Sequence, residues 1–331
     1  MDKTSKVSVI GSGSWATAIV KILHENLPSV GWYIREPEII QNLNEHSHNP
    51  TFLSSVRFDM NKLRISNDLN EVVRESDVLV FVVPSAYARI WLEPLTESLE
   101  DKFVISATKG IVPEEYITVT ELFNKHYNLP YDKIGVISGP CHAEEVALER
   151  LSYLTFSCKR REKAEEVAEL FGSYYIRTIP STDIYGTEYS AILKNIFAVA
   201  AGIAHGLGYG DNFMAVLISN AQREMKRFLD KTYPSSRKTN ASAYLGDLLV
   251  TSYSQFSRNR TFGTMIGKGY SVKTAQLEMN MVAEGYYATE GIKKINERFG
   301  VKMPITDAVY NILYERISPA IEFKLLTEKL K

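Results

Sequence analysis

The sequence predicts an α/β domain with a doubly wound, mainly parallel sheet, followed by an all-helical domain. Three observations support this prediction: short β-branched runs alternate with helical patterns in the first half, several of these runs are apolar without strict alternation, and strand patterns stop after Pro180. Parallel strands that helices cover on both faces are apolar at nearly every position. We place the two domains at residues 1–182 and 183–331.

The first domain is expected to begin with a strand at Val7–Ile10 and a helix at Trp15–Glu25. Repetition of this strand–helix–strand pattern indicates parallel strands joined by crossover helices. Further strands are expected at Val30–Ile34, Val78–Val83, Phe103–Ser106, Ile134–Ile137, Tyr153–Ser157 and Tyr174–Ile179, and further helices at Pro37–Asn44 and Arg161–Phe171. In the second domain, polar loops are expected near Lys231–Asn240 and Lys268–Ser271.

Composition excludes several classes of protein. The 331 residues include 38 Lys and Arg against 39 Asp and Glu, and binding along a nucleic-acid backbone needs a cationic surplus, so nucleic acid is not expected as a partner. Two cysteines, Cys141 and Cys158, are too few for a disulfide framework and favour the cytoplasm. No secretory signal and no apolar stretch of the roughly 18 residues that a membrane span needs are visible.

The clearest motif is the turn Gly11-Ser12-Gly13-Ser14-Trp15-Ala16, directly after the first strand and at the start of a helix. Gly11 would permit the tight turn, Gly13 would let the backbone approach a pyrophosphate, and the small Ala16 would let the helix pack on the strand. In this context the motif predicts a Rossmann-like dinucleotide site, with the anion at the helix N-terminus. The alternative is a glycine turn without a ligand.

The end of the second strand, Tyr33-Ile34-Arg35-Glu36, bears on the choice of cofactor. Sites that prefer NAD usually carry an acidic residue there, which binds the ribose 2′-hydroxyl, whereas an arginine can accommodate a 2′-phosphate. Arg35 favours NADP, and Glu36 leaves NAD possible. We therefore expect both cofactors to work, with NADPH at least competitive; the alternative is that Arg35 is a solvated strand end.

Lys194 lies in the middle of the segment 188–203, which is apolar nearly all round and predicts a central helix. Burial disfavours an ammonium and lowers its pKa, so a lysine held there would titrate near neutrality and suit acid–base chemistry on an oxygen. The alternative is a lysine whose charge reaches solvent at the helix edge. Asn195 is a second polar group on the same helix.

Polar clusters also follow two predicted strands of the sheet. Lys109 lies in Ala107–Gly110, and Gly139, Cys141 and His142 lie in Ser138–Ala143, both at carboxyl ends of strands, where ligands bind in such sheets. Ordinary strand–helix turns are the alternative for both clusters.

The second half of the chain carries Asp247 and, after it, the run Ser257-Arg258-Asn259-Arg260, which suits a compact oxyanion such as phosphate. A solvated basic turn is the alternative. The six histidines show no metal-ligand spacing and no GxSxG is present, so we expect neither a catalytic metal nor a serine hydrolase. A nucleophilic Cys141 is not favoured, because no activating base is evident.

Taken in order, these motifs closely resemble NAD(P)-dependent glycerol-3-phosphate dehydrogenase of the bacterial type, from about Val7 to about Glu315. The resemblance implies reversible hydride transfer between nicotinamide and carbon two of a phosphorylated three-carbon substrate, which supplies the glycerol phosphate of phospholipids, and it implies a homodimer. The motifs that carry it are Gly11–Trp15, Ala107–Gly110, Ser138–Pro140, Leu193–Asn195, Leu245–Asp247, Ser257–Gly263, Val282–Gly285 and Met303–Ile305.

The resemblance also implies roles for single residues. Lys194 would accept a proton in alcohol oxidation and donate it in ketone reduction, and Lys109 and Asp247 would hold the reacting end of the substrate. Substrate contacts are implied for Lys109, Gly139, Cys141, Lys194, Asp247, Ser257, Arg258 and Asn259. Cofactor contacts are implied for Ser14, Trp15, Arg35, Lys109, Ala143, Arg258, Val282 and Glu284, beside Gly11 and Gly13 of the turn.

Four positions depart from the family pattern. Cys141 stands where Ser or Thr is usual, and a thiol is a weak hydrogen-bond partner, so only a backbone role is well supported there. His142 replaces an aromatic residue, and Ile218-Ser219-Asn220 replaces a Thr-Arg pair. Tyr244 replaces a glycine that would tolerate positive φ.

Two alternative interpretations of the function stay open. A relative with the same architecture could act on another small substrate, such as a 3-hydroxyacid, although the cluster Ser257–Arg260 favours a phosphate. A cofactor-binding module without catalysis would need neither Lys194 nor Asp247.

Overall fold

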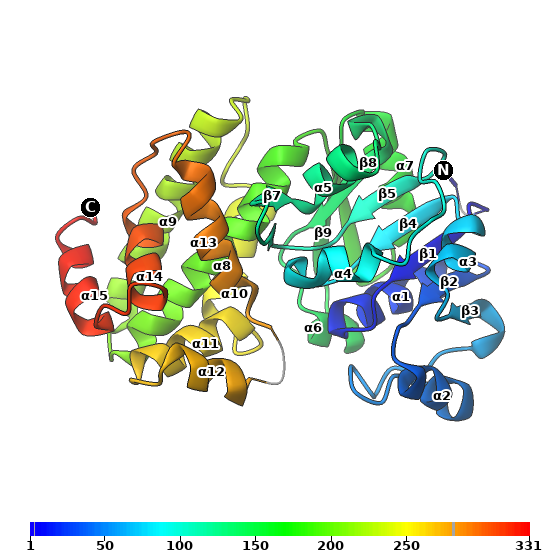
Figure 1. Cartoon of the computed structure of the whole chain (residues 1–331), viewed down its shortest axis with the longest axis horizontal. Coiled ribbons are helices and arrows are strands. Elements are labelled where there is room, and N and C mark those ends of the chain that lie inside the picture. The colour runs from blue at the N-terminus through cyan, green and yellow to red at the C-terminus, as the bar shows by residue number, and fades with distance from the viewer. Residues whose placement is uncertain (3, 280–281) are drawn as a thin grey trace. The chain divides into compact units, whose positions relative to one another are not determined.

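The computed structural model describes residues 1–2, 4–279 and 282–331 (Figure 1). It contains two compact units, one made of Met1–Thr108 with Val119–Ile184 and the other of Lys109–Thr118 with Tyr185–Lys331. The sequence did not predict that residues 109–118 belong to the second unit. The division into a dinucleotide-binding domain, 1–182, and a substrate domain, 183–331, stays a prediction.

Unit 1, the first of these units, is built on an eight-stranded sheet in the order β10-β9-β8-β5-β4-β1-β2-β3. All neighbouring strands are parallel except β8 and β9, which confirms the predicted mainly parallel sheet. The strand order runs outward in both directions from β1 and β4, and ligands bind outside the carboxyl ends of strands at such a switch point. The strands are β1 Val7–Ile10, β2 Val30–Tyr33, β3 Leu63–Ser66, β4 Val78–Phe81, β5 Phe103–Ser106, β8 Ile134–Ser138, β9 Ser152–Cys158 and β10 Ile176–Ser181.

Helices connect these strands and bury the apolar sheet. The first helix, α1, contacts β1 and β2 as well as α6 and α7, and its Ala16, Ile19 and Leu23 are fully buried. The helices of this unit are α1 Ser14–Asn26, α2 Pro37–His46, α3 Leu69–Arg74, α4 Ala88–Leu92, α5 Val119–His126, α6 Ala143–Ala147 and α7 Arg161–Phe171. The pattern of alternating strands and helices therefore produces the predicted α/β architecture.

Unit 2 is helical apart from the short hairpin β6 Ile111–Val112 with β7 Ile117–Thr118. Its central helix, α8 Ile184–Gly206, is buried along almost its whole length, as the apolar sequence predicts. The other helices are α9 Asp211–Thr232, α10 Asp247–Tyr253, α11 Arg258–Gly267, α12 Val272–Glu278, α13 Glu284–Asn296, α14 Pro304–Leu313 and α15 Pro319–Thr327, and a π-helical turn, η4 Ser242–Gly246, precedes α10. The predicted all-helical second part, residues 183–331, is thus confirmed, and the hairpin belongs to the added residues 109–118.

Two glycines bring α11 directly against α8. A Cβ at Gly202 of α8 would overlap the main-chain oxygen of Arg260, and a Cβ at Gly263 of α11 would overlap that of Val199. Only glycine permits such backbone contact between helices. This packing fixes the start of α11, where the predicted anion cluster lies, relative to the helix that carries Lys194.

No helix among the described residues is both long enough and apolar enough to cross a membrane.

Candidate active site

A buried polar cluster surrounds Lys194 in unit 2. The ammonium of Lys194 donates hydrogen bonds to Oδ1 of Asp247 and to Oγ1 of Thr251, the latter at 2.9 Å. The ammonium of Lys109 lies 3.8 Å from Oδ2 of the same aspartate. Lys194 is 4% exposed and Asp247 is 1% exposed, so the ion pair is shielded from water. Lys194 is therefore not a lysine that reaches solvent at the helix edge.

The start of α10 positions the partners of Lys194. Asp247 and Thr251 are four residues apart, so they share one face of the helix, and the Thr251 hydroxyl donates to the main-chain oxygen of Asp247 at 2.6 Å. That hydroxyl is therefore oriented with a lone pair toward Lys194. One turn before Lys194, Oγ of Ser190 lies 3.2 Å from the main-chain oxygen of Ala243 and links α8 to the π-helical turn.

Asn195 holds the segment that carries Lys109. Its amide nitrogen donates to the main-chain oxygen of Lys109 at 2.8 Å. Two residues later, Ile111 packs against Gly291 of α13, where a Cβ would overlap the isoleucine side chain. These contacts explain why residues 109–118 belong to unit 2 and why Lys109 reaches Asp247.

Burial changes the acid–base behaviour of Lys194. Desolvation lowers the pKa of Lys194 to about 7; the negative charge of Asp247 opposes this shift, and the positive charge of Lys109 adds to it. A lysine that titrates near neutrality can both donate and accept a proton at physiological pH. The cluster can therefore transfer a proton to or from a nearby oxygen atom.

The first residues of α11 are held by internal hydrogen bonds. Ser257 caps the helix by accepting from the amide of Arg260 at 3.3 Å, and Oδ1 of Asn259 accepts from the amide of Gly285 at 2.8 Å. The hydroxyl hydrogen of Ser257 and the amide nitrogen of Asn259 can still donate to a ligand. Arg258 lies between them and is half-buried.

The bond from Asn259 to Gly285 also joins α11 to the beginning of α13. Glu284 is the first residue of α13, and Val282 lies two residues before it. The predicted phosphate cluster and two of the predicted cofactor contacts are thus structurally coupled within unit 2.

In unit 1, the turn after β1 fits the pyrophosphate of a dinucleotide. Gly11 has φ +131° and its oxygen accepts from the indole of Trp32 at 2.7 Å. Gly13 immediately precedes α1, and a Cβ at this position would meet no atom within 4 Å, so an anion has room to reach the first amides of the helix. The side-chain amide of Asn49 donates to Ser12 O at 2.9 Å and holds the turn.

The remaining predicted residues of unit 1 lie beside the same sheet. Ser14 and Trp15 begin α1, and the latter is half-buried. Gly139 follows β8 directly and has φ +129°. A Cβ at this position would lie only 2.5 Å from the main-chain oxygen of Tyr153. Cys141 is buried in the core of the unit, and Ala143 is the first residue of α6.

The departures from the family pattern have local explanations. Tyr244 lies in the π-helical turn and is not among the described residues with positive φ, so no glycine is required there. Asn220 exchanges two hydrogen bonds with the main chain of Lys331, at 2.9 and 3.2 Å. His142 is the N-cap residue of α6.

Sequence reasoning missed three residues that shape these sites: Thr251, Asn49, and Trp91, whose ring centroid lies 5.2 Å from the guanidinium carbon of Arg35. Thr251 could have been found, since it lies four residues after Asp247 in a helical pattern. Asn49 and Trp91 are distant in sequence from the residues that they contact, so no local signal indicated them.

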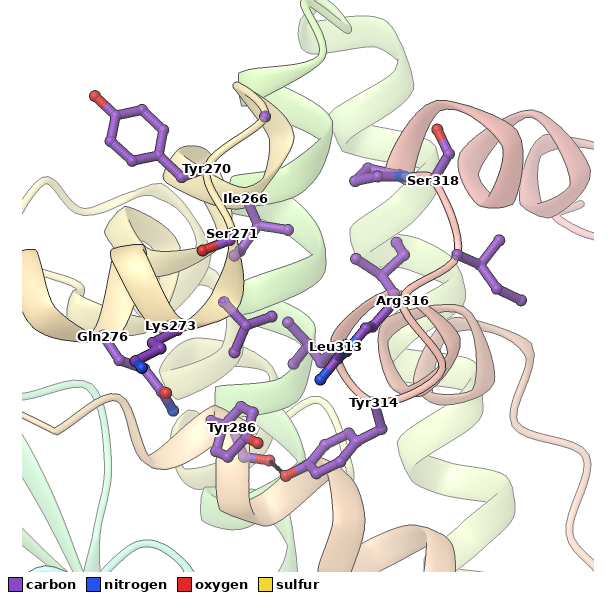
Figure 2. A pocket seen from close by; sticks show the side chains of 15 residues that line it. Ile266, Tyr270, Ser271, Lys273, Gln276, Tyr286, Leu313, Tyr314, Arg316 and Ser318 are labelled. Atoms are coloured by element: carbon purple, nitrogen blue, oxygen red, sulfur yellow. Dashed lines mark hydrogen bonds between the residues drawn. The ribbon is translucent and has the colours of Figure 1, made fainter.

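A cavity of about 740 Å³ in unit 2 contains none of the predicted site residues (Figure 2). Among the described residues, its lining includes Lys273 and Arg316 but no acidic side chain, and the hydroxyl of Tyr314 donates to the main-chain oxygen of Tyr286 at 2.9 Å. Ile266, Ile312 and Leu313 form a buried apolar part of this lining.

Known proteins match almost the whole chain. Residues 6–164 match the family described as NAD-dependent glycerol-3-phosphate dehydrogenase N-terminus, and residues 183–324 match the corresponding C-terminus. The chain is 35% identical to glycerol-3-phosphate dehydrogenase [NAD(P)+] of Bacillus subtilis over 323 residues, 96% of this chain and 93% of that protein.

It is 36% identical to the enzyme of the same name from Exiguobacterium over 327 residues, which cover 98% of this chain and 96% of that one. Among solved structures, glycerol-3-phosphate dehydrogenase from Coxiella burnetii superposes with a TM-score of 0.90 at 27% identity, covering 98% of this chain and 99% of that chain.

Proposed function

The chain belongs to the NAD-dependent glycerol-3-phosphate dehydrogenase family, and from this premise we propose that it catalyses the reversible reduction of dihydroxyacetone phosphate to sn-glycerol 3-phosphate with NADH or NADPH. The observation that carries the proposal is the buried ammonium of Lys194, bonded to Asp247 and Thr251, with Lys109 3.8 Å from the same aspartate. This arrangement suits proton transfer to a substrate oxygen.

Lys194 is assigned the proton transfer. In the reducing direction its ammonium would donate a hydrogen bond to the carbonyl oxygen, stabilise the negative charge that develops there and then give up its proton. In the oxidising direction the neutral amine would take the proton of the alcohol. Because burial brings the pKa of Lys194 to about 7, both protonation states are accessible near neutral pH. When bound, the dinucleotide supplies or accepts the hydride.

Asp247 and Lys109 are assigned to the reacting end of the substrate. The carboxylate of Asp247 fixes the ammonium of Lys194 in the buried site, and Lys109 brings a second positive charge to the same carboxylate. A second cation there would favour the charged, deprotonated oxygen of the transition state over the neutral carbonyl.

The phosphate of the substrate is assigned to Ser257, Arg258 and Asn259, and Gly139 and Cys141 to further substrate contacts. The bidentate donors of an arginine match the oxygens of a phosphate, and the internal bonds of Ser257 and Asn259 hold this helix start in place. Binding energy from the phosphate would orient the carbonyl for reaction.

The dinucleotide is assigned to the turn Gly11–Trp15, with contacts from Arg35, Lys109, Ala143, Arg258, Val282 and Glu284. The open space beside Gly13 supports the place of the pyrophosphate. We extend the proposal to a cytoplasmic homodimer that supplies the glycerol phosphate of phospholipids; these points rest on the family alone.

The test follows the loss of reduced nicotinamide absorbance with NADH and with NADPH, using dihydroxyacetone phosphate as substrate and unphosphorylated dihydroxyacetone as the control. We expect turnover with both cofactors and a large preference for the phosphorylated ketone. Equal use of the two ketones, or turnover only with a 3-hydroxyacid and oxidised cofactor, would overturn the proposal.

A further inference from the structure

We propose that Trp91 is a specificity-determining residue that positions the guanidinium of Arg35 for the 2′-phosphate of NADP. Trp91 acts through Arg35 and is a positioning residue. The inference rests on the proposed dinucleotide site at Gly11–Trp15 but not on the identity of the substrate.

Arg35 lies next to the proposed pyrophosphate turn. Tyr33, the last residue of β2, pairs with Ile10, the last residue of β1, and the amide of Gly11 donates to the oxygen of Tyr33 at 3.2 Å. Arg35 follows two residues after Tyr33, at the same carboxyl edge of the sheet. A side chain at this place can reach the ribose nearer the adenine of a bound dinucleotide.

The indole of Trp91 holds the guanidinium of Arg35. The guanidinium carbon lies 5.2 Å from the centroid of the Trp91 ring, within the range of a cation–π interaction. Trp91 itself is 9% exposed, and the ring of Tyr33 meets it edge-on, with 5.8 Å between ring centroids and an angle of 86° between ring planes. The support beneath Arg35 is therefore a buried, packed ring.

The guanidinium keeps its hydrogen-bond donors for a ligand. Over the described ranges of the chain, no hydrogen bond or ion pair to Arg35 is formed, although this side chain is exposed. A guanidinium that lies over an indole keeps its N–H groups for other hydrogen bonds, and this contact reduces the conformational entropy that a flexible arginine would lose on binding. Trp91 thus prepares Arg35 to bind a phosphate.

Glu36 supplies the competing preference. Its Oε2 is buried and accepts no hydrogen bond from any residue that the structure describes, which suits a ribose hydroxyl as donor. The pKa of Tyr33 is raised chiefly by burial, while Arg35 lowers it and Glu36 raises it, so both charges act at the same place. The balance between Arg35 on Trp91 and Glu36 would set the preference between NADPH and NADH.

The experiment measures dissociation constants by titration calorimetry for 2′,5′-ADP, which carries the 2′-phosphate, and for 5′-AMP, which lacks it. The variants are Trp91→Phe, Trp91→Leu, Arg35→Gln and the double variant Arg35→Gln with Trp91→Leu. Arg74→Gln is the matched control, because it removes another exposed arginine of unit 1, one that pairs with Glu97. Titration of NADPH and NADH repeats the comparison with whole cofactors.

Trp91→Leu removes the cation–π contact. We expect it to raise the dissociation constant of 2′,5′-ADP by about 2-fold to 5-fold and to leave that of 5′-AMP nearly unchanged. Trp91→Phe, which keeps an aromatic ring and packs more conservatively, should lie between Trp91→Leu and the unmodified protein. In the Arg35→Gln background Trp91→Leu should have no further effect on 2′,5′-ADP, because the residue through which Trp91 acts is gone.

Two results would overturn the inference: an equal rise in the dissociation constants of both ligands, or an effect of Trp91→Leu on 2′,5′-ADP binding that persists in the Arg35→Gln background. Either result would indicate a structural role for Trp91 or a direct contact with adenine. If Trp91→Leu does not fold, Trp91→Phe, alone and combined with Arg35→Gln, decides by the same two criteria. If the ligands behave as expected but dihydroxyacetone phosphate is not turned over, the proposed function fails and this inference stands.

Discussion

The hydroxyl of Thr251 accepts a hydrogen bond from the buried ammonium of Lys194 at 2.9 Å while it donates to the main-chain oxygen of Asp247 at 2.6 Å. The helix that carries the aspartate therefore contacts Lys194 at two points. With two fixed acceptors, the ammonium keeps one N–H for a substrate oxygen.

Replacement of Thr251 by valine is expected to lower kcat by about 10-fold to 100-fold, since a hydrogen bond to a charged group is lost with little change in volume. Steady-state kinetics with dihydroxyacetone phosphate measures the effect. Thr251→Ser keeps the hydroxyl and should restore most of the rate. Equal rates for the valine and serine variants would show that the hydroxyl does not position Lys194.

Lys194 is expected to set the pH dependence of both directions of the reaction. Because its pKa is lowered to about 7, oxidation of glycerol 3-phosphate, which needs the neutral amine, should rise with pH and level off above about 7. Reduction of the ketone, which needs the ammonium, should fall as pH rises through the same value. Lys194→Ala should lower turnover by about 10²-fold to 10⁴-fold in both directions, with cofactor affinity kept.

The neighbours of Lys194 provide the control for this assignment. Asp247 raises the pKa of Lys194 and Lys109 lowers it, so Asp247→Asn should move the midpoint of the pH profile down and Lys109→Gln should move it up. The midpoints can be read even where the rates are low. Midpoints that stay in place in both variants would assign the profile to another group.

Much of the architecture could be predicted because β1, β2, β4, β5 and β8 are buried at every position and are therefore mostly apolar. The helix predicted at Arg161–Phe171 begins and ends as expected, and α1 extends the predicted Trp15–Glu25 by one residue at each end. The strand β3, Leu63–Ser66, was missed because its four residues are only half-buried and include Arg64, so the run lacks an apolar signal.

The arrangement around Lys194 could be predicted only in part. A lysine in an apolar helix is conspicuous in sequence, whereas Thr251 looks like an ordinary helical threonine until α10 is placed against α8. One predicted strand was also too long. The strand β4 ends at Phe81 and not at Val83, and just after its end the main-chain oxygen of Val82 lies against Gly11. The contact of Arg35 with Trp91 joins the segment after β2 to α4, and no spacing rule connects residues so far apart.

Arg258 provides a test of the phosphate assignment. Arg258→Ala should raise KM for dihydroxyacetone phosphate by about 10-fold or more, because charge-assisted bidentate bonds would be lost, with a smaller effect on kcat. At saturating cofactor, the slow reaction of this variant with unphosphorylated dihydroxyacetone should not change. Arg223→Ala, which removes an exposed arginine of α9, serves as the control for net charge. A loss that is equal for both ketones would place Arg258 away from the phosphate.

Glu224 allows a prediction about stability that is independent of catalysis. Its two carboxylate oxygens accept from the amides of Ile305 and Thr306, both at 2.9 Å, at the beginning of α14, and the side chain is fully buried. A glutamine at this position would place its NH2 group, which is a donor, against one of these two N–H donors. We expect Glu224→Gln to destabilise the protein by about 1–3 kcal/mol, measured by urea unfolding.

The pH dependence of this effect follows from the sign of the pKa shift. Burial raises the pKa of Glu224 to about 7, against the opposing hydrogen bonds from Ile305 and Thr306. A group whose folded-state pKa is raised contributes stability that is fully present below its unfolded value and is lost as pH rises through the folded value. The stability difference between the unmodified protein and Glu224→Gln should therefore shrink as pH rises from about 5 to 8.

Glu322→Gln is the matched control, since Glu322 is also a buried glutamate of unit 2 but its carboxylate accepts from one side-chain amide, that of Asn311, at 3.2 Å. This variant should be destabilised less, because it does not place an amide group against two main-chain N–H donors. A difference between unmodified protein and Glu224→Gln that stays constant from about pH 5 to 8 would mean that the hydrogen bonds from α14 outweigh burial and that Glu224 is ionised throughout this range.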